Sequence, residues 1–122
     1  MAFVDVEDWL VVGLDARLSW PVASKPQQSA TRFVVVRRTG GAATLRVFDR
    51  PLVVVETYAP FEGQAVEMLN EARAYLLALR GIERSVNVYR VSEVGGPGNL
   101  PDPLRPKLAR YTATFELHLI GL

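Results

Sequence analysis

Glu116 and His118 are the two residues of this chain best suited by type and spacing to acid–base chemistry. An imidazole and a carboxylate can exchange a proton near neutral pH. Glu56 is a second candidate, because it lies in a very apolar run where burial would shift the pKa of its carboxyl group. Two residues at positions i and i+2 of a strand are also an ordinary solvated pair, and Glu56 could instead pair with an arginine. The residues alone therefore leave a catalytic and a structural interpretation open.

Other kinds of active site find little support in the residue types. The chain has no Cys and a single His, which excludes disulfides, thiol catalysis and Cys-ligated metal. A metal bound through His118 would need carboxylates or a second subunit. The Gly95–Gly98 stretch, GGPG, lacks the Lys-Ser/Thr ending of a phosphate-binding loop and opens no helix. We therefore expect no enzyme, no metal and no cofactor.

Length and charge narrow the class of protein further. The 122 residues are 49% hydrophobic, which predicts one folded domain over residues 1–122. Net charge is +1, from 14 basic and 13 acidic residues, whereas nucleic-acid binders usually have a marked basic excess. No apolar run approaches the roughly 20 residues needed to cross a membrane. The first residues lack the basic start and apolar centre of a signal peptide, so we expect synthesis in the cytoplasm.

Periodicity predicts an α+β fold with the order α-β-β-α-β-β. We expect a four-stranded, mainly antiparallel sheet with both helices packed on one face. The helices are predicted at 4–18 and 61–80, a β-hairpin at 31–38 and 44–59, and two further strands at 85–94 and 110–120. Long loops are predicted at 19–30 and 92–109.

Several local features support these elements. Asp5 is placed as an N-cap with Asp8 three residues later, and Gly13, inside the first helix, predicts a close neighbour. Pro51 is expected at a bulge or at the start of a strand. Residues 110–120 alternate between apolar and polar, as expected for a strand with one wet face.

The segment 92–106 is unusual, because four of its fifteen residues are Pro and three are Gly. Proline lacks an N–H donor, so we expect this segment to leave the sheet and form a stiff, protruding arm that contacts a partner. A solvated loop without a partner is the alternative. Candidate contact residues in this arm are Gly95, Gly96, Pro97, Asn99, Leu100, Asp102 and Arg105. A second set surrounds the hairpin and comprises Arg37, Arg38, Arg46, Arg50 and Glu56. These arginines could instead be a charged strand end that discourages edge pairing.

Three stretches of the chain resemble the tail terminator (tail completion) proteins of long-tailed phages, in the versions found in phages of actinobacteria. They are FVVVRRTGG…RVFDRPLVVVETYA, PFEGQAVEMLNEARAYLLALRG and VNVYRVSEVGGPGNLPDPL…RYTATFELHLIG. The similarity covers about residues 5–121. None of these stretches is a catalytic signature, so the resemblance depends on their extent and order.

The resemblance implies a structural protein of the virion neck. Members of this family form hexameric rings on the head-proximal end of the tail tube, stop tube polymerisation and present the surface that joins the head. The implied partners are other copies of the chain, the tail-tube protein and a head–tail connector or stopper, and DNA passes through the lumen. The resemblance implies no membrane, no cofactor and no enzymatic role. A ring requires two different contact patches on each subunit.

Three other interpretations remain open at this stage. The chain could be a head–tail connector or stopper, which differs from a terminator in the partner it binds. It could be a small α+β enzyme or ligand-binding domain that uses His118, Glu116 and Glu56. Nucleic-acid binding through the hairpin arginines is a third possibility, which the net charge of +1 disfavours.

Overall fold

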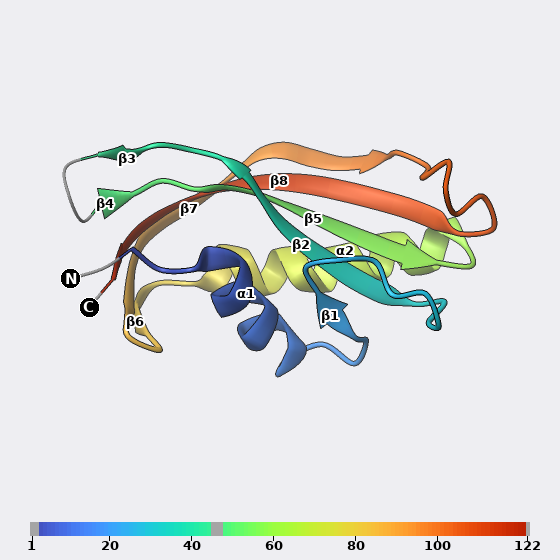
Figure 1. Ribbon diagram of the computed structural model, residues 1–122, viewed down its shortest axis with the longest axis horizontal. Coiled ribbons are helices and arrows are strands. Elements are labelled where there is room, and N and C mark those ends of the chain that lie inside the picture. The colour runs from blue at the N-terminus through green and yellow to red at the C-terminus, as the bar shows by residue number, and fades with distance from the viewer. Residues whose placement is uncertain (1–2, 45–47, 122) are drawn as a thin grey trace.

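The computed structural model describes residues 3–44 and 48–121, and within these ranges strands β1 to β8 belong to one mixed sheet (Figure 1). The helices are α1 (Val6–Asp15) and α2 (Glu62–Ala78). The strands are β1 (Val22–Ala23), β2 (Phe33–Gly40), β3 (Ala43–Thr44), β4 (Phe48–Asp49), β5 (Leu52–Ala59), β6 (Gly81–Glu83), β7 (Val86–Asn99) and β8 (Ala109–Gly121).

Helix α1 begins where the sequence predicts. The Asp5 carboxylate accepts a hydrogen bond from the Asp8 amide at 3.2 Å, which satisfies one of the free amides of the first turn. The prediction of a close neighbour at Gly13 is also confirmed. A Cβ at this position would collide with the Tyr75 hydroxyl and with the Arg84 guanidinium.

The α+β class and the two helices are confirmed, but the four-stranded antiparallel sheet is wrong. Strand β5 lies between β2 and β8, and β7 pairs with the other side of β8, all antiparallel. The predicted loop 19–30 contains β1, which pairs parallel with β2 through Val22 and Val34. Strand β6 pairs with the start of β7. The hairpin is interrupted at Pro51, as expected for a residue without an N–H donor, and β4 continues along β8 before that break.

The predicted loop 92–109 is the second correction, because residues 92–99 belong to β7 rather than to a protruding arm. Gly95 pairs with Thr114 and Gly98 with Thr112, so Gly96 and Pro97 together oppose a single residue of β8. This is a β-bulge, and a bulge accommodates a proline because the extra residue is left out of the hydrogen-bond ladder. The sheet therefore continues through the Gly-Pro segment.

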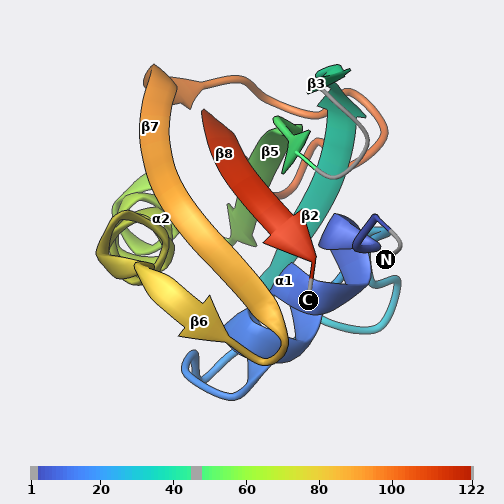
Figure 2. The ribbon, with the colours of Figure 1, turned by 90° about the vertical axis from the view of Figure 1, so that its left-hand side faces the viewer.

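The main core lies between the sheet and the two helices. We call the side of the sheet covered by α1 and α2 the helix face, and the opposite side the outer face. Viewed along the long axis, the twisted sheet curls around the helices (Figure 2). Val34, Val55 and Phe115 are completely buried on the helix face, and burial of each such side chain contributes about 1.5–3 kcal/mol. The predicted alternation of residues 110–120 is confirmed, since Ala113, Phe115, Leu117 and Leu119 are buried.

A second, smaller apolar cluster lies on the outer face. Phe33, Val35 and Tyr58 are buried there, and Leu108 and Ala30 pack against them. Leu108 belongs to the segment that follows β7, so this segment folds back over the sheet instead of extending into solvent. We call residues 100–108 the proline loop, after Pro101, Pro103 and Pro106.

Candidate interaction surfaces

Asp102 fixes the conformation of the proline loop. Its side chain is buried and accepts hydrogen bonds from the Leu104 amide at 2.9 Å, the Arg105 guanidinium at 3.1 Å and the Tyr58 hydroxyl at 3.1 Å. Burial alone would raise the pKa of the Asp102 carboxyl group, but these three donors, with the nearby charge of Arg110, lower it below its ordinary value. The ionised carboxylate therefore anchors the loop to the outer face.

Tyr58 is the residue of the sheet to which the loop is anchored. Its ring stacks on Phe33 with 4.4 Å between centroids, and the guanidinium groups of Arg105 and Arg110 each lie 6.0 Å from its centre. Burial is the main reason that the pKa of the Tyr58 hydroxyl is raised above its usual value. The hydroxyl is therefore protonated at neutral pH and can donate to Asp102.

Glu56 is buried next to this anchor, and the expectation that it pairs with an arginine is confirmed. Its carboxylate lies 2.6 Å from the Arg37 guanidinium and 3.3 Å from that of Arg110. Arg110 also donates to the Leu100 carbonyl at 2.6 Å. The ion pairs of the sheet and the start of the proline loop are thus connected through Arg110.

The other arginines predicted around the hairpin do not belong to this network. Arg38 forms a bidentate ion pair with buried Asp49, at 2.8 and 2.9 Å, and donates to the carbonyls of Gly40 and Gly41. These contacts hold the hairpin together, so Arg38 has a structural role. Arg50 is exposed, and Arg46 lies outside the described residues.

Glu116 and His118 lie side by side on the outer face, with 2.8 Å between the carboxylate and Nε2. The imidazole ring lies nearly perpendicular to the Phe48 ring, with 6.0 Å between their centroids. Three hollows lie beside the two helices, and none of them is lined by Glu116, His118 or Glu56. Within residues 3–44 and 48–121, none of these three hollows joins the three residues of the enzyme interpretation.

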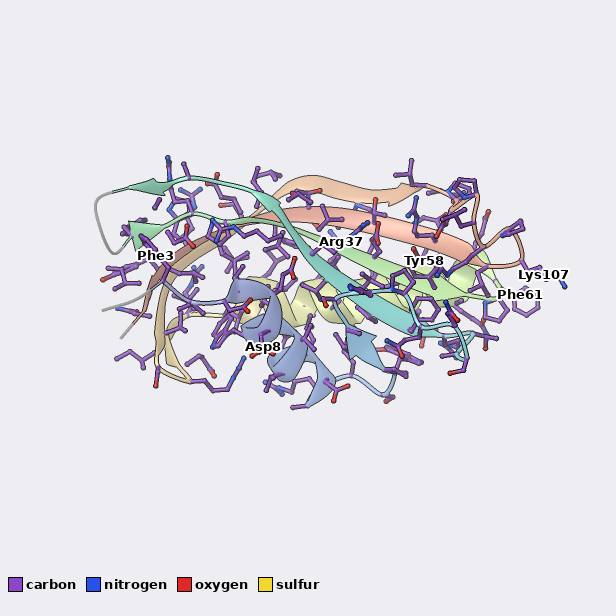
Figure 3. The ribbon with its side chains drawn as sticks, viewed as in Figure 1. Phe3, Asp8, Arg37, Tyr58, Phe61 and Lys107 are labelled. Carbon is purple, nitrogen blue, oxygen red and sulfur yellow. The ribbon has the colours of Figure 1, made fainter. Side chains whose placement is uncertain are left out.

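One end of the molecule exposes large apolar side chains. Phe61, at the start of α2, is 69% exposed, and Leu104, in the proline loop, is 83% exposed. Figure 3 shows Phe61 and Lys107 together at this end. The Asn99 amide donates to the Glu62 carboxylate at 3.2 Å, which links the end of β7 to the start of α2. We call the surface formed by Phe61, Leu100 and Leu104 the end surface.

A second surface lies on the helix face, where the C-terminal ends of the two helices approach each other. A hollow of about 400 Å³ lies between the end of α1 and the second half of α2, and we call it the helix groove. Leu18 and Leu79 form apolar parts of its wall, and Tyr75 contributes an aromatic ring. Glu71 and Glu83 supply two carboxylates to the same hollow.

The structure brings together only part of the predicted contact set. Four of the predicted residues lie in or beside the anchored proline loop. Arg110 bonds both Glu56 and the Leu100 carbonyl, and Arg105 bonds Asp102 within the loop. The other predicted residues lie elsewhere on the sheet. The bulged part of β7 contains Gly95, Gly96 and Pro97, and its last residue, Asn99, pairs with Tyr111. The half-exposed Arg37 pairs with Glu56.

Sequence reasoning missed four residues of these surfaces: Tyr58, Phe61, Leu104 and Arg110. A signal was available for Leu104, because a large apolar residue isolated in a Pro-rich loop has no partner close in sequence. Tyr58 and Arg110 owe their roles to the pairing of β5 with β8 across 52 residues of sequence.

Within residues 3–44 and 48–121 no cluster of three or more His, Asp or Glu side chains is arranged to hold a metal ion. The helices in these ranges are too short and too polar to cross a membrane. No protein-family model matches the chain, and a search of curated proteins also finds no match.

Proposed function

We propose that this protein is a tail terminator of a long-tailed phage. Six copies form a ring on the head-proximal end of the tail tube, stop its polymerisation and present the surface that joins the filled head. DNA passes through the lumen without being held. The protein is made in the host cytoplasm, acts in the neck of the virion, and has no enzymatic role. The resemblance of about residues 5–121 to this family supports the proposal.

The observation that carries the proposal is the presence of two different candidate contact surfaces on one chain. A closed ring is built from a heterologous interface, in which one patch of each subunit meets a different patch of the next. The end surface exposes Phe61, Leu100 and Leu104, whereas the helix groove is a hollow between α1 and α2. The two surfaces differ in shape and share no residue, as expected for the two patches of a heterologous interface.

A further exposed apolar surface is available for contacts with partners outside the ring. The end of the molecule opposite to Phe61 carries Phe3 and strand β6 (Figures 1 and 3). Phe3 is 50% exposed and Ile82, in β6, is 70% exposed. A neck protein must bind the tube on one side and a head-side protein on the other, so exposed apolar groups beyond those used between subunits are expected.

Binding to the cognate tail-tube protein tests this function. The purified chain is added to tail-tube protein under conditions in which tubes elongate, and tube lengths are measured by negative-stain microscopy. A terminator shortens the tubes and is found at one end of each. A chain that binds portal-side proteins and leaves tube length unchanged would instead be a head–tail connector or stopper.

A further inference from the structure

The proline loop presents one leucine in a fixed position. Leu104 is 83% exposed, although the neighbouring Asp102 is buried and bonded to the Leu104 amide. The backbone amides of Arg105 and Leu108 are also bonded within the loop, to the carbonyls of Asp102 and Arg105. A side chain displayed on a rigid loop loses little conformational entropy on binding. The loop is therefore preorganised to insert Leu104 into a partner.

The helix groove has the size and lining to receive such a side chain. Its volume of about 400 Å³ lies within the usual range for binding pockets. Leu18, Ala74 and Leu79 give it apolar walls. Leu104 cannot reach the groove of its own chain, because Asp102 and Leu108 hold the proline loop against the outer face, whereas the groove lies on the helix face.

The charges around the two surfaces are complementary. Lys107 is exposed three residues after Leu104, whereas the Arg105 guanidinium is paired with Asp102 within the loop. The groove contains the exposed carboxylates of Glu71 and Glu83 against one guanidinium, that of Arg17. Neither carboxylate has an ion-pair partner within the described part of the chain.

The same charge separation extends over the helix side of the molecule. Helix α1 and its flanking residues contain four carboxylates and one arginine: Asp5, Glu7, Asp8, Asp15 and Arg17. The guanidinium of Arg84 also packs on this helix, over the Trp9 ring, so carboxylates outnumber guanidinium groups here by four to two. Contact between the helix sides of two copies would bring like charges together, whereas contact between the helix side and the proline loop brings opposite charges together. The charges therefore favour a head-to-tail contact over a symmetric one.

We propose that the proline loop of one copy docks into the helix groove of the next copy, with Leu104 in the hollow and Lys107 beside Glu71 and Glu83. This inference deepens the proposed function, on which it rests, by assigning the contact between neighbouring subunits of the ring. The contact is heterologous, so each copy uses its loop on one side and its groove on the other.

Disulfide trapping tests the contact directly, because the native chain has no cysteine. The double variant Leu104→Cys/Ala74→Cys is oxidised and analysed by non-reducing gel electrophoresis. Docking brings the two positions within the distance at which a disulfide forms. The expected product is a ladder of covalent oligomers, formed at least tenfold faster than in Leu104→Cys/Ala42→Cys, where the second cysteine lies at an exposed hairpin alanine outside the groove.

Two results would overturn the proposed contact. One is an equal rate of trapping in the test and control pairs, and the other is a single Leu104→Cys variant that dimerises as fast as the test pair forms its ladder. A charge test adds independent evidence. Lys107→Glu should slow trapping several-fold, and adding Glu83→Lys to it should restore the rate; the absence of any restoration counts against the assigned charge pairing.

The outcome is separable from that of the proposed function. Rings that cap tube ends but give no loop-to-groove ladder would retain the terminator and refute this contact. A ladder in a protein that leaves tubes unaffected would retain the contact and refute the terminator.

Discussion

Replacing Asp102 by alanine tests whether the proline loop is held by a single buried carboxylate. The substitution removes the acceptor used by the Leu104 amide, the Arg105 guanidinium and the Tyr58 hydroxyl. Hydrogen bonds to a charged group contribute about 1.5–3 kcal/mol each when buried, but the partly exposed Arg105 contributes less. We expect Asp102→Ala to lower the free energy of unfolding by about 2–4 kcal/mol.

Urea denaturation followed by circular dichroism measures this loss. The matched control is Tyr58→Phe, which keeps the stack on Phe33 and removes one donor to Asp102, at an expected cost of about 1 kcal/mol. The double variant should lose about 1 kcal/mol less stability than the sum of the two single-variant losses, because both substitutions remove the same hydrogen bond. An Asp102→Ala protein within about 0.5 kcal/mol of the parent would refute the anchoring role.

The pH dependence of the same anchor has a defined sign. The pKa of Asp102 is lowered in the folded protein, so the ionised carboxylate favours folding. Its contribution is complete above the ordinary pKa of about 3.9 and is lost as the pH falls through the lower pKa of the folded state. The stability difference between the parent and Asp102→Asn should therefore be constant above about pH 5 and shrink below about pH 4. A difference that persists unchanged at pH 2 would contradict this assignment.

Three further substitutions test other parts of the structure. Glu56→Gln should lower the free energy of unfolding in urea by about 1–2 kcal/mol, because it replaces the buried carboxylate that pairs with Arg37 by an amide. The value is modest because Arg37 is half exposed; an unchanged free energy would show that this pair is energetically neutral. Gly13→Ala gains about 1 kcal/mol of helix propensity but must displace the ends of two flexible side chains, the Tyr75 hydroxyl and the Arg84 guanidinium, and the lost Arg84 bond to the Trp9 carbonyl costs about 1 kcal/mol. We therefore expect the free energy of unfolding to change by less than about 1 kcal/mol; a gain of the full helix propensity would show that Gly13 has no close neighbour. Leu104→Ser should change stability by less than about 0.5 kcal/mol while weakening self-association in sedimentation experiments; unchanged association would argue against its role in assembly.

The local elements of this fold could be predicted because their signals are local. The cap at Asp5, the restricted position of Gly13 and the alternation in β8 each depend on residues close in sequence or on a single steric requirement. The break at Pro51 follows from its missing N–H donor. These predictions were confirmed for that reason.

The course of the chain after Glu93 could not be predicted in the same way. The Pro and Gly content indicated a segment that leaves the sheet, but a bulge absorbs Pro97 and the strand continues to Asn99. The proline loop then folds back because Asp102 finds donors on Tyr58 and Arg105. A carboxylate in a Pro-rich segment gives no indication in the sequence of the distant tyrosine that it will contact.

The candidate contact residues likewise include some that the sequence indicated and some that it did not. Leu100, Asp102 and Arg105 were predicted from the unusual composition of their segment, although the reason for their importance is the anchored loop rather than a protruding arm. The helix groove was not predicted, because it forms where the ends of two helices far apart in sequence approach each other. Exposure of Leu104 likewise follows from the conformation of the loop.

The most direct test of the central claim is the mass and shape of the assembled protein at the end of a tail tube. Light scattering and negative-stain microscopy of the purified chain, with and without its cognate tail-tube protein, measure both. The terminator account predicts six-fold rings, either free or capping one end of shortened tubes. A monomer that neither caps the tubes nor changes their length would contradict it.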